Sequence, residues 1–120
     1  GPLGGQFSAP HGGICARLLP EVVKANYRRC QMDPQLANVR ARFDEVGRIL
    51  TGNPQAAGEE AIAFLHELCG DLKIPGLASY GIRETHFGGI ISRASKASSM
   101  KGNPVELPEP ELEAILRNAL

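Results

Sequence analysis

The sequence contains no tryptophan, few other aromatic residues and no net charge. Its thirteen basic and thirteen acidic side chains cancel, so the charge balance favours neither a nucleic acid nor an anionic membrane surface as a partner. Four phenylalanines and two tyrosines offer few of the aromatic platforms on which single-stranded nucleic acids stack. The apolar runs are far too short to cross a bilayer. We therefore expect no nucleic-acid partner, no membrane association and a cytoplasmic protein.

Cysteine is also scarce, and its spacing excludes the usual cysteine-based sites. Cys15, Cys30 and Cys69 are an odd number with no Cys-x-x-Cys pair among them. Such a pattern predicts reduced, partly buried thiols that pack as small apolar side chains. No stretch alternates apolar and polar residues with β-branched enrichment, which is the pattern of a strand.

Helical spacing of apolar residues runs through most of the chain and predicts an all-α fold, a compact bundle of about five or six helices. The expected long helices cover residues 34–50, 54–72, 83–99 and 108–119, with shorter helices after residue 11. The clearest is the first of these, because Asp33 is a good N-cap, Pro34 suits the first turn and Gly52 suits the end.

Proline and glycine are expected to modify two of these regions. Pro20 lacks a backbone donor and clashes with the preceding turn, so two short helices should meet at Leu19-Pro20. The polar segment 27–33 is expected to be a loop. Gly88 and Gly89 each cost a helix about 1 kcal/mol relative to alanine, which predicts the close approach of another backbone there.

His11 is the residue whose surroundings best fit metal chemistry. It follows Pro10, precedes two glycines and begins a helix, where the dipole disfavours imidazolium and so favours the neutral form that binds metals. Cys15 lies four residues later and could share its helix face, although two ligands do not close a site. The alternatives are a capping or surface role for His11 and core packing for Cys15. We interpret His66 and His86 as structural.

The chain's organisation is expected to be simple. Residues 1–4 read as the scar of a cleaved expression tag, and residues 5–120 are expected to form a single helical domain.

Several short motifs occur in an order and spacing that resemble one enzyme family. They are Ala9-Pro10-His11-Gly12, Leu18-Leu19-Pro20, Asn26, Ile74-Pro75 with Leu77 and Gly81, and Gly102-Asn103-Pro104. In register from about residue 7 to the end, they resemble the C-terminal domain of iron-containing (group III) alcohol dehydrogenases. The resemblance implies the helical part of a two-domain enzyme whose NAD(P)-binding α/β domain lies upstream and is absent from these residues.

The resemblance also implies a site. His11 would be the last ligand of a divalent metal, commonly iron (Fe²⁺) and sometimes zinc (Zn²⁺), with an Asp and two His upstream as the others. Ser98, Ser99 and Met100 would lie near the substrate pocket. Cys15 departs from the family, which usually has Asn there, and this departure bears on the hydrogen bonding near the metal. The metal would polarise the oxygen of an alcohol or aldehyde, and the nicotinamide would take the hydride.

Three hypotheses follow from these observations. The first is the metal-binding helical domain of an NAD(P)-dependent alcohol dehydrogenase, inactive by itself and binding no cofactor tightly. The second is a stand-alone helical interaction or oligomerisation module without catalysis, whose apolar surface recruits a partner or drives self-association. The third is a metal-binding regulator that uses His11 and Cys15.

Overall fold

A computed structural model describes residues 9–120, and in this range the chain forms helices and no strand. The α-helices are α2 (His11–Met32), α3 (Ala37–Thr51), α4 (Gly58–Asp71), α5 (Phe87–Lys96) and α6 (Glu109–Ala119). Four short 3-10 helices connect them: η1 (Pro34–Leu36), η2 (Leu77–Tyr80), η3 (Glu84–His86) and η4 (Ser98–Gly102). The prediction of an all-α bundle of about five or six helices is confirmed.

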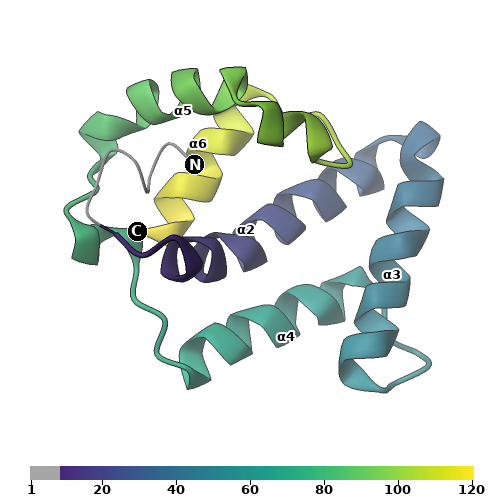
Figure 1. Cartoon of the computed structure of the whole chain (residues 1–120). Helices are drawn as coiled ribbons and strands as arrows, with labels where there is room; N and C mark the ends of the chain where they lie inside the picture. Colours follow the sequence, from purple (N-terminus) through teal and green to yellow (C-terminus); the bar gives the residue numbers. More distant parts are fainter. Residues whose placement is uncertain (1–8) are drawn as a thin grey trace.

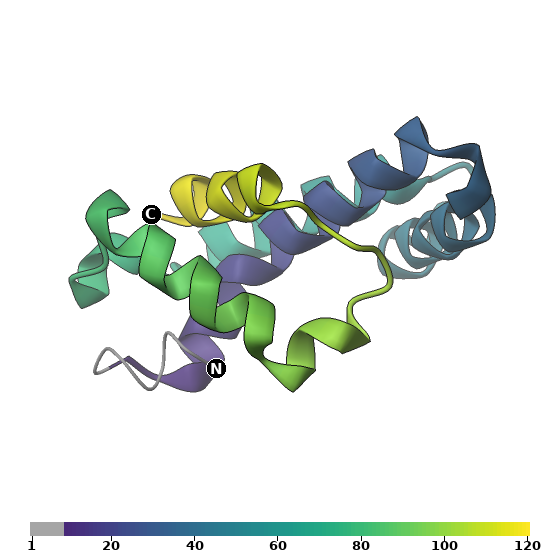
Figure 2. The ribbon, with the colours of Figure 1, turned by 90° about the horizontal axis from the view of Figure 1, so that it is seen from above.

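Helix α2 is the axis around which the other helices are arranged. It contacts α3, α4 and α6 directly. Figure 1 shows α4 on one side of α2, α5 and α6 on the other, and α3 crossing near its C-terminal end. Viewed from above in Figure 2, α3 is seen nearly end-on while α2 runs along the page, so the two helices cross steeply. The fold therefore places the start of α2 beside α5 and α6 and its C-terminal end beside α3.

The prediction that Pro20 divides this segment into two helices is wrong, because α2 continues through it to Met32. A proline at this position leaves the carbonyl of Ala16, four residues earlier, without its helical donor. The Sγ of Cys69 in α4 lies 3.2 Å from that carbonyl oxygen and donates a hydrogen bond to it. Packing against a neighbouring helix thus satisfies the group that the proline leaves open.

The predicted loop over residues 27–33 is also wrong, since all of it but the last residue is helix. Tyr27 and Cys30 are buried there, at 2% and 3% exposure. The last two turns of α2 are polar in sequence, but Tyr27 and Cys30 are enclosed where α2 packs against α3 and α4.

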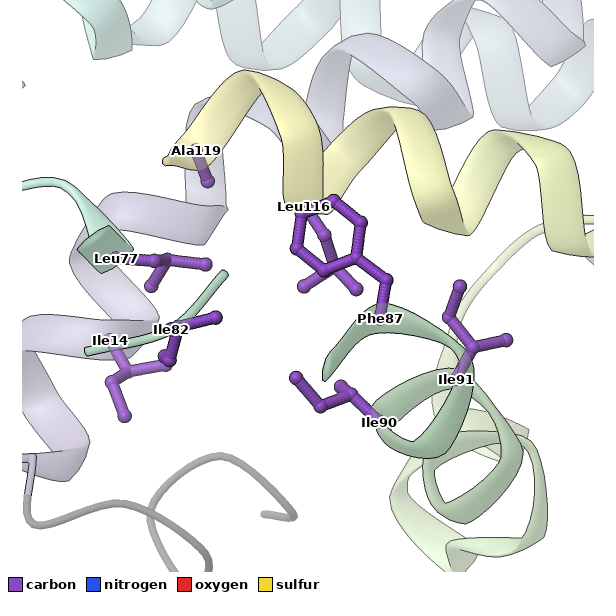
Figure 3. Packing of buried hydrophobic residues seen from close by; sticks show 8 residues of the cluster. All are labelled: Ile14, Leu77, Ile82, Phe87, Ile90, Ile91, Leu116 and Ala119. Atoms are coloured by element: carbon purple, nitrogen blue, oxygen red, sulfur yellow. The ribbon is translucent and has the colours of Figure 1, made fainter. Parts of the chain in front are cut away.

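The principal apolar core joins the first turns of α2 to the second half of the chain. Figure 3 shows eight of its side chains, which come from α2, residues 77–82, α5 and α6. They are Ile14, Leu77, Ile82, Phe87, Ile90, Ile91, Leu116 and Ala119. This cluster fixes the beginning of α2 against α5 and α6, and so positions the residues that precede and follow Ile14.

A polar junction holds the other half together. One carboxylate oxygen of Asp44 in α3 accepts hydrogen bonds from the Tyr27 hydroxyl at 2.7 Å and from the Gly58 amide at 2.8 Å. Burial, and then the hydrogen bond to Asp44, raise the pKa of Tyr27. A side chain at Gly58 would collide with the Tyr27 ring, because its Cβ would lie 2.3 Å from a ring carbon. Helix α4 can therefore begin against α2 only with glycine in this place.

Helix ends agree with the sequence where local signals control them. Asp33 accepts a hydrogen bond from the Gln35 amide at 2.9 Å, and Gly52 adopts a left-handed conformation with φ of 70° at the end of α3. Other bounds differ: α4 begins at Gly58 rather than at residue 54, and the helix expected over 83–99 is η3 followed by a shorter α5.

Close backbone approach occurs at glycines other than the predicted pair. Nothing lies within 4 Å of a Cβ placed on Gly88, and only the Arg93 side chain lies near one on Gly89, so that prediction is wrong within the described residues. A Cβ on Gly47 would lie 1.9 Å from the Ala57 carbonyl oxygen. This contact joins α3 to the residue that precedes α4, and the helical spacing of apolar residues does not predict it.

Candidate metal-ligand site at the start of α2

His11 is the first residue of α2, and its side chain is exposed. Pro10 precedes it with an extended backbone, and its carbonyl accepts the Ile14 amide at 3.1 Å, which closes the first helical turn. Gly12 has no neighbour within 4 Å of a Cβ placed on it, while a Cβ on Gly13 would lie 3.0 Å from the Tyr80 hydroxyl. The local sequence thus presents an imidazole on an uncrowded edge.

Cys15 lies one turn further along the same face. Its Sγ is 3.4 Å from Nε2 of His11, and both side chains are exposed. The shared face is confirmed, and the alternative that Cys15 packs in the core is wrong. Cys30, by contrast, is buried, and burial raises the pKa of its thiol, which suits an inert packing role.

Two donors of this kind can form part of a metal site. An imidazole nitrogen and a thiolate sulfur are common ligands of divalent transition metals. Among residues 9–120, however, no group of three or more His, Cys, Asp and Glu side chains is close enough to hold an ion. The residues present therefore fit part of a metal site and supply two of its donors.

The other two histidines have partners of their own. Nε2 of His66 in α4 lies 3.4 Å from a carboxylate oxygen of Glu21, a buried residue of α2. Nδ1 of His86 accepts the backbone amide of Arg83 at 3.0 Å. The first contact joins α4 to α2 and the second caps η3, and both agree with the structural interpretation of these histidines.

The predicted substrate-pocket residues lie at the far end of α5 from His11. Met100 belongs to η4, which follows α5, whereas the core around Ile14 contains residues that precede α5 and residues of its first half. Ten residues of α-helix separate these ends by about 15 Å. The side chains of Ser98 and Ser99 lie outside the described part of the structure, as do residues 1–8, so those predictions stay predictions.

Met100 does line a cavity, but one of apolar character. The cavity has a volume of about 210 Å³ and lies between α2, α5, η4 and α6. Its lining includes Leu18, Val22, Ile90, Ala94, Ala97 and Leu112. Within the described residues the structure does not bring Met100 and His11 into one site.

Two motif residues that sequence reasoning did not connect are bonded to each other. The side-chain amides of Asn26, inside α2, and Asn103, after η4, each donate a hydrogen bond to the other's oxygen at 2.9 Å. Asn103 also donates to the carbonyl of Val105. Asn26 lies in the interior of α2, and this bond links α2 to the loop before α6. The co-occurrence of two asparagines in spaced motifs was the available signal.

The fold and the pair of His11 and Cys15 define a class: an all-α domain with an exposed histidine and cysteine at the start of its central helix. The chain belongs to the iron-containing alcohol dehydrogenase family, because the sequence model "Fe-containing alcohol dehydrogenase family, C-terminal" matches residues 1–120. The family is enzymatic, and this chain corresponds to its C-terminal domain.

Individual relatives agree with this assignment. The chain is 34% identical to 1,3-propanediol dehydrogenase of Klebsiella pneumoniae over 119 residues, and this match covers 98% of this chain and 30% of the relative. It is 31% identical over 119 residues to alcohol dehydrogenase 4 of Schizosaccharomyces pombe, which covers 98% and 26%. The crystal structure of a 1,3-propanediol oxidoreductase matches with a TM-score of 0.82 at 30% identity, over 99% of this chain and 30% of that one. The chain thus spans less than a third of the length of these relatives.

One further expectation concerns membranes. Among the described residues, no helix is both long and apolar enough to cross a bilayer.

Proposed function

We propose that this chain is the C-terminal helical part of an NAD(P)-dependent, divalent-metal-dependent oxidoreductase of alcohols and aldehydes, with His11 as one metal ligand. The family assignment supports the reaction class. The single observation that carries the site is the exposed imidazole of His11 at the start of α2, held in place by the core around Ile14. We place the protein in the cytoplasm and take residues 5–120 as one domain after a four-residue tag remnant.

Each part of the proposed enzyme would have its own task. When bound, the metal (Fe²⁺ or Zn²⁺) would act as a Lewis acid on the substrate oxygen. His11 would hold one coordination position from a rigid helix start. The nicotinamide and the remaining ligands would come from an N-terminal domain outside these residues. Ser98, Ser99 and Met100 remain our candidates for the substrate side of the domain.

We infer that the chain by itself does not oxidise alcohols. No third ligand accompanies His11 and Cys15 among residues 9–120, and no nucleotide-binding strand-turn-helix unit occurs in that range. A Lewis acid held by two groups on one helix face would lack the enclosed geometry that orients substrate and hydride acceptor.

The test uses a longer protein that contains the upstream domain. His11→Ala should lower bound metal and NAD(P)-dependent alcohol oxidation, the latter by about 100-fold or more, since loss of even a residue that orients a metal ligand costs about 10–100-fold. The matched control His66→Ala changes another exposed histidine, in α4, and should leave metal content unaltered. Equal metal content and activity in His11→Ala and the unchanged protein would refute the assignment.

A stand-alone interaction module is the second candidate, and one observation favours it. Large apolar side chains are exposed in α2, in α3 and directly after α4, at 67% for Met32, 70% for Ile49 and 63% for Leu72. Such surface can drive self-association. Light scattering over a range of concentrations tests this function, and a strictly monomeric chain at high concentration would count against it.

A further inference from the structure

We infer that Cys15 is a second metal ligand beside His11, so that this chain by itself binds a thiophilic divalent cation such as Zn²⁺. The inference rests on the proposed function for the role of His11. It goes further by adding a sulfur donor to that ligand and by predicting metal binding without the upstream domain.

The separation of the two donor atoms matches what a tetrahedral ion requires. Zinc lies about 2.0–2.1 Å from an imidazole nitrogen and about 2.3 Å from a thiolate sulfur. At a tetrahedral angle these bond lengths place nitrogen and sulfur about 3.6 Å apart. Nε2 of His11 and Sγ of Cys15 are 3.4 Å apart. An ion could therefore be chelated with only a small adjustment of side-chain torsions.

Helix α2 holds the two donor atoms close together. Residues four apart lie on one face, and the first turn of α2 is closed by the bond from the Ile14 amide to the Pro10 carbonyl. Ile14, between the two ligands, is buried in the core, which fixes the rotation of the turn. Both donors are exposed, so an ion reaches them from solvent without opening the fold.

The ligand types decide the class of ion. A sulfur and an imidazole nitrogen together favour zinc and similar thiophilic ions over hard cations such as Mg²⁺ or Ca²⁺. On binding, the Cys15 thiol gives its proton to solvent and a sulfur–metal bond forms, with no change in oxidation state. Water would fill the other positions in this chain, and ligands from the upstream domain would replace it in the longer protein.

Cobalt(II) provides the direct test, because thiolate ligation gives it an intense near-ultraviolet charge-transfer absorption that imidazole and water do not give. We expect this band when the reduced 120-residue chain is titrated with Co²⁺, and its loss on addition of Zn²⁺. Cys15→Ser should abolish the band and weaken Zn²⁺ binding by about tenfold or more. Cys69→Ser is the matched control, since the Cys69 thiol is bonded to the Ala16 carbonyl, and it should leave the band unchanged.

Two outcomes with the 120-residue chain overturn the inference: no charge-transfer band in the unchanged chain, or an undiminished band in Cys15→Ser. Circular dichroism checks that both variants fold, which we expect because Cys15 is exposed and a serine at position 69 keeps a hydrogen-bond donor. In the longer protein, metal content lowered by His11→Ala but unaffected by Cys15→Ala would overturn this inference and leave the proposed function standing. Metal content unaffected by His11→Ala would instead refute the proposed function.

Discussion

The continuity of α2 through Pro20 depends on a thiol in another helix, and this can be tested by mutation. Cys69→Ala removes the donor whose sulfur lies 3.2 Å from the Ala16 carbonyl oxygen. The carbonyl then has neither the helical amide that Pro20 lacks nor its substitute. We expect the domain to be destabilised and the helix around Pro20 to be the part most affected.

The magnitude follows from the cost of an unsatisfied group. A hydrogen bond contributes about 0.5–1.5 kcal/mol net, and an unpaired buried acceptor costs about 1–3 kcal/mol. The thiol is a weak donor and Ala16 is only half-buried, so we expect about 1 kcal/mol from this bond. Lost packing of the sulfur adds to that figure. For a domain of this size, 1 kcal/mol lowers Tm by about 4 °C.

A double-mutant cycle isolates the bond from the packing. In a Pro20→Ala background the new amide can bond the Ala16 carbonyl itself, so Cys69→Ala should cost about 1 kcal/mol less than it does with Pro20 present. Urea unfolding of the four proteins measures this coupling, and Cys69→Ser should behave nearly as the unchanged chain because a hydroxyl also donates. A coupling energy indistinguishable from zero would refute the role assigned to Cys69.

Three further predictions concern glycines, an amide pair and a tyrosine. Gly88→Ala should raise the free energy of unfolding by about 0.5–1 kcal/mol, because the position is helical and no atom lies near the new Cβ. Gly47→Ala should destabilise the domain strongly, because its Cβ would lie 1.9 Å from a carbonyl oxygen, and thermal unfolding of both variants compares the two effects. Asn26→Ala should cost about 1–3 kcal/mol by leaving the side-chain oxygen of Asn103 without its donor, and chemical denaturation should show a smaller penalty for the double alanine variant than the sum of the single penalties. The pKa of Tyr27 is raised in the folded state, so its contribution to stability is complete below about pH 10 and is lost as the pH rises through the folded-state pKa. Tyr27→Phe should flatten that part of the curve of stability against pH, and an identical slope in the variant would contradict the effect of burial.

Much of the functional hypothesis depends on local features that the sequence displays directly. A histidine and a cysteine four residues apart share a helix face whatever surrounds them, and that spacing allows their 3.4 Å contact. Met100 is different, since its placement at the far end of α5 depends on where the chain turns after Lys96. No periodicity reports that turn, so the resemblance alone suggested that Met100 lies near a substrate.

The sequence by itself determined the all-α class, the caps at Asp33 and Gly52, and the paired donors at the start of α2, because each depends on residues within a turn or two of one another. Tertiary structure alone decided that α2 passes through Pro20, because the compensating thiol is 53 residues away from the carbonyl it satisfies. It also decided that Asn26 meets a partner 77 residues later. Interactions over such distances in sequence depend on how helices pack, and local propensity carries no record of them.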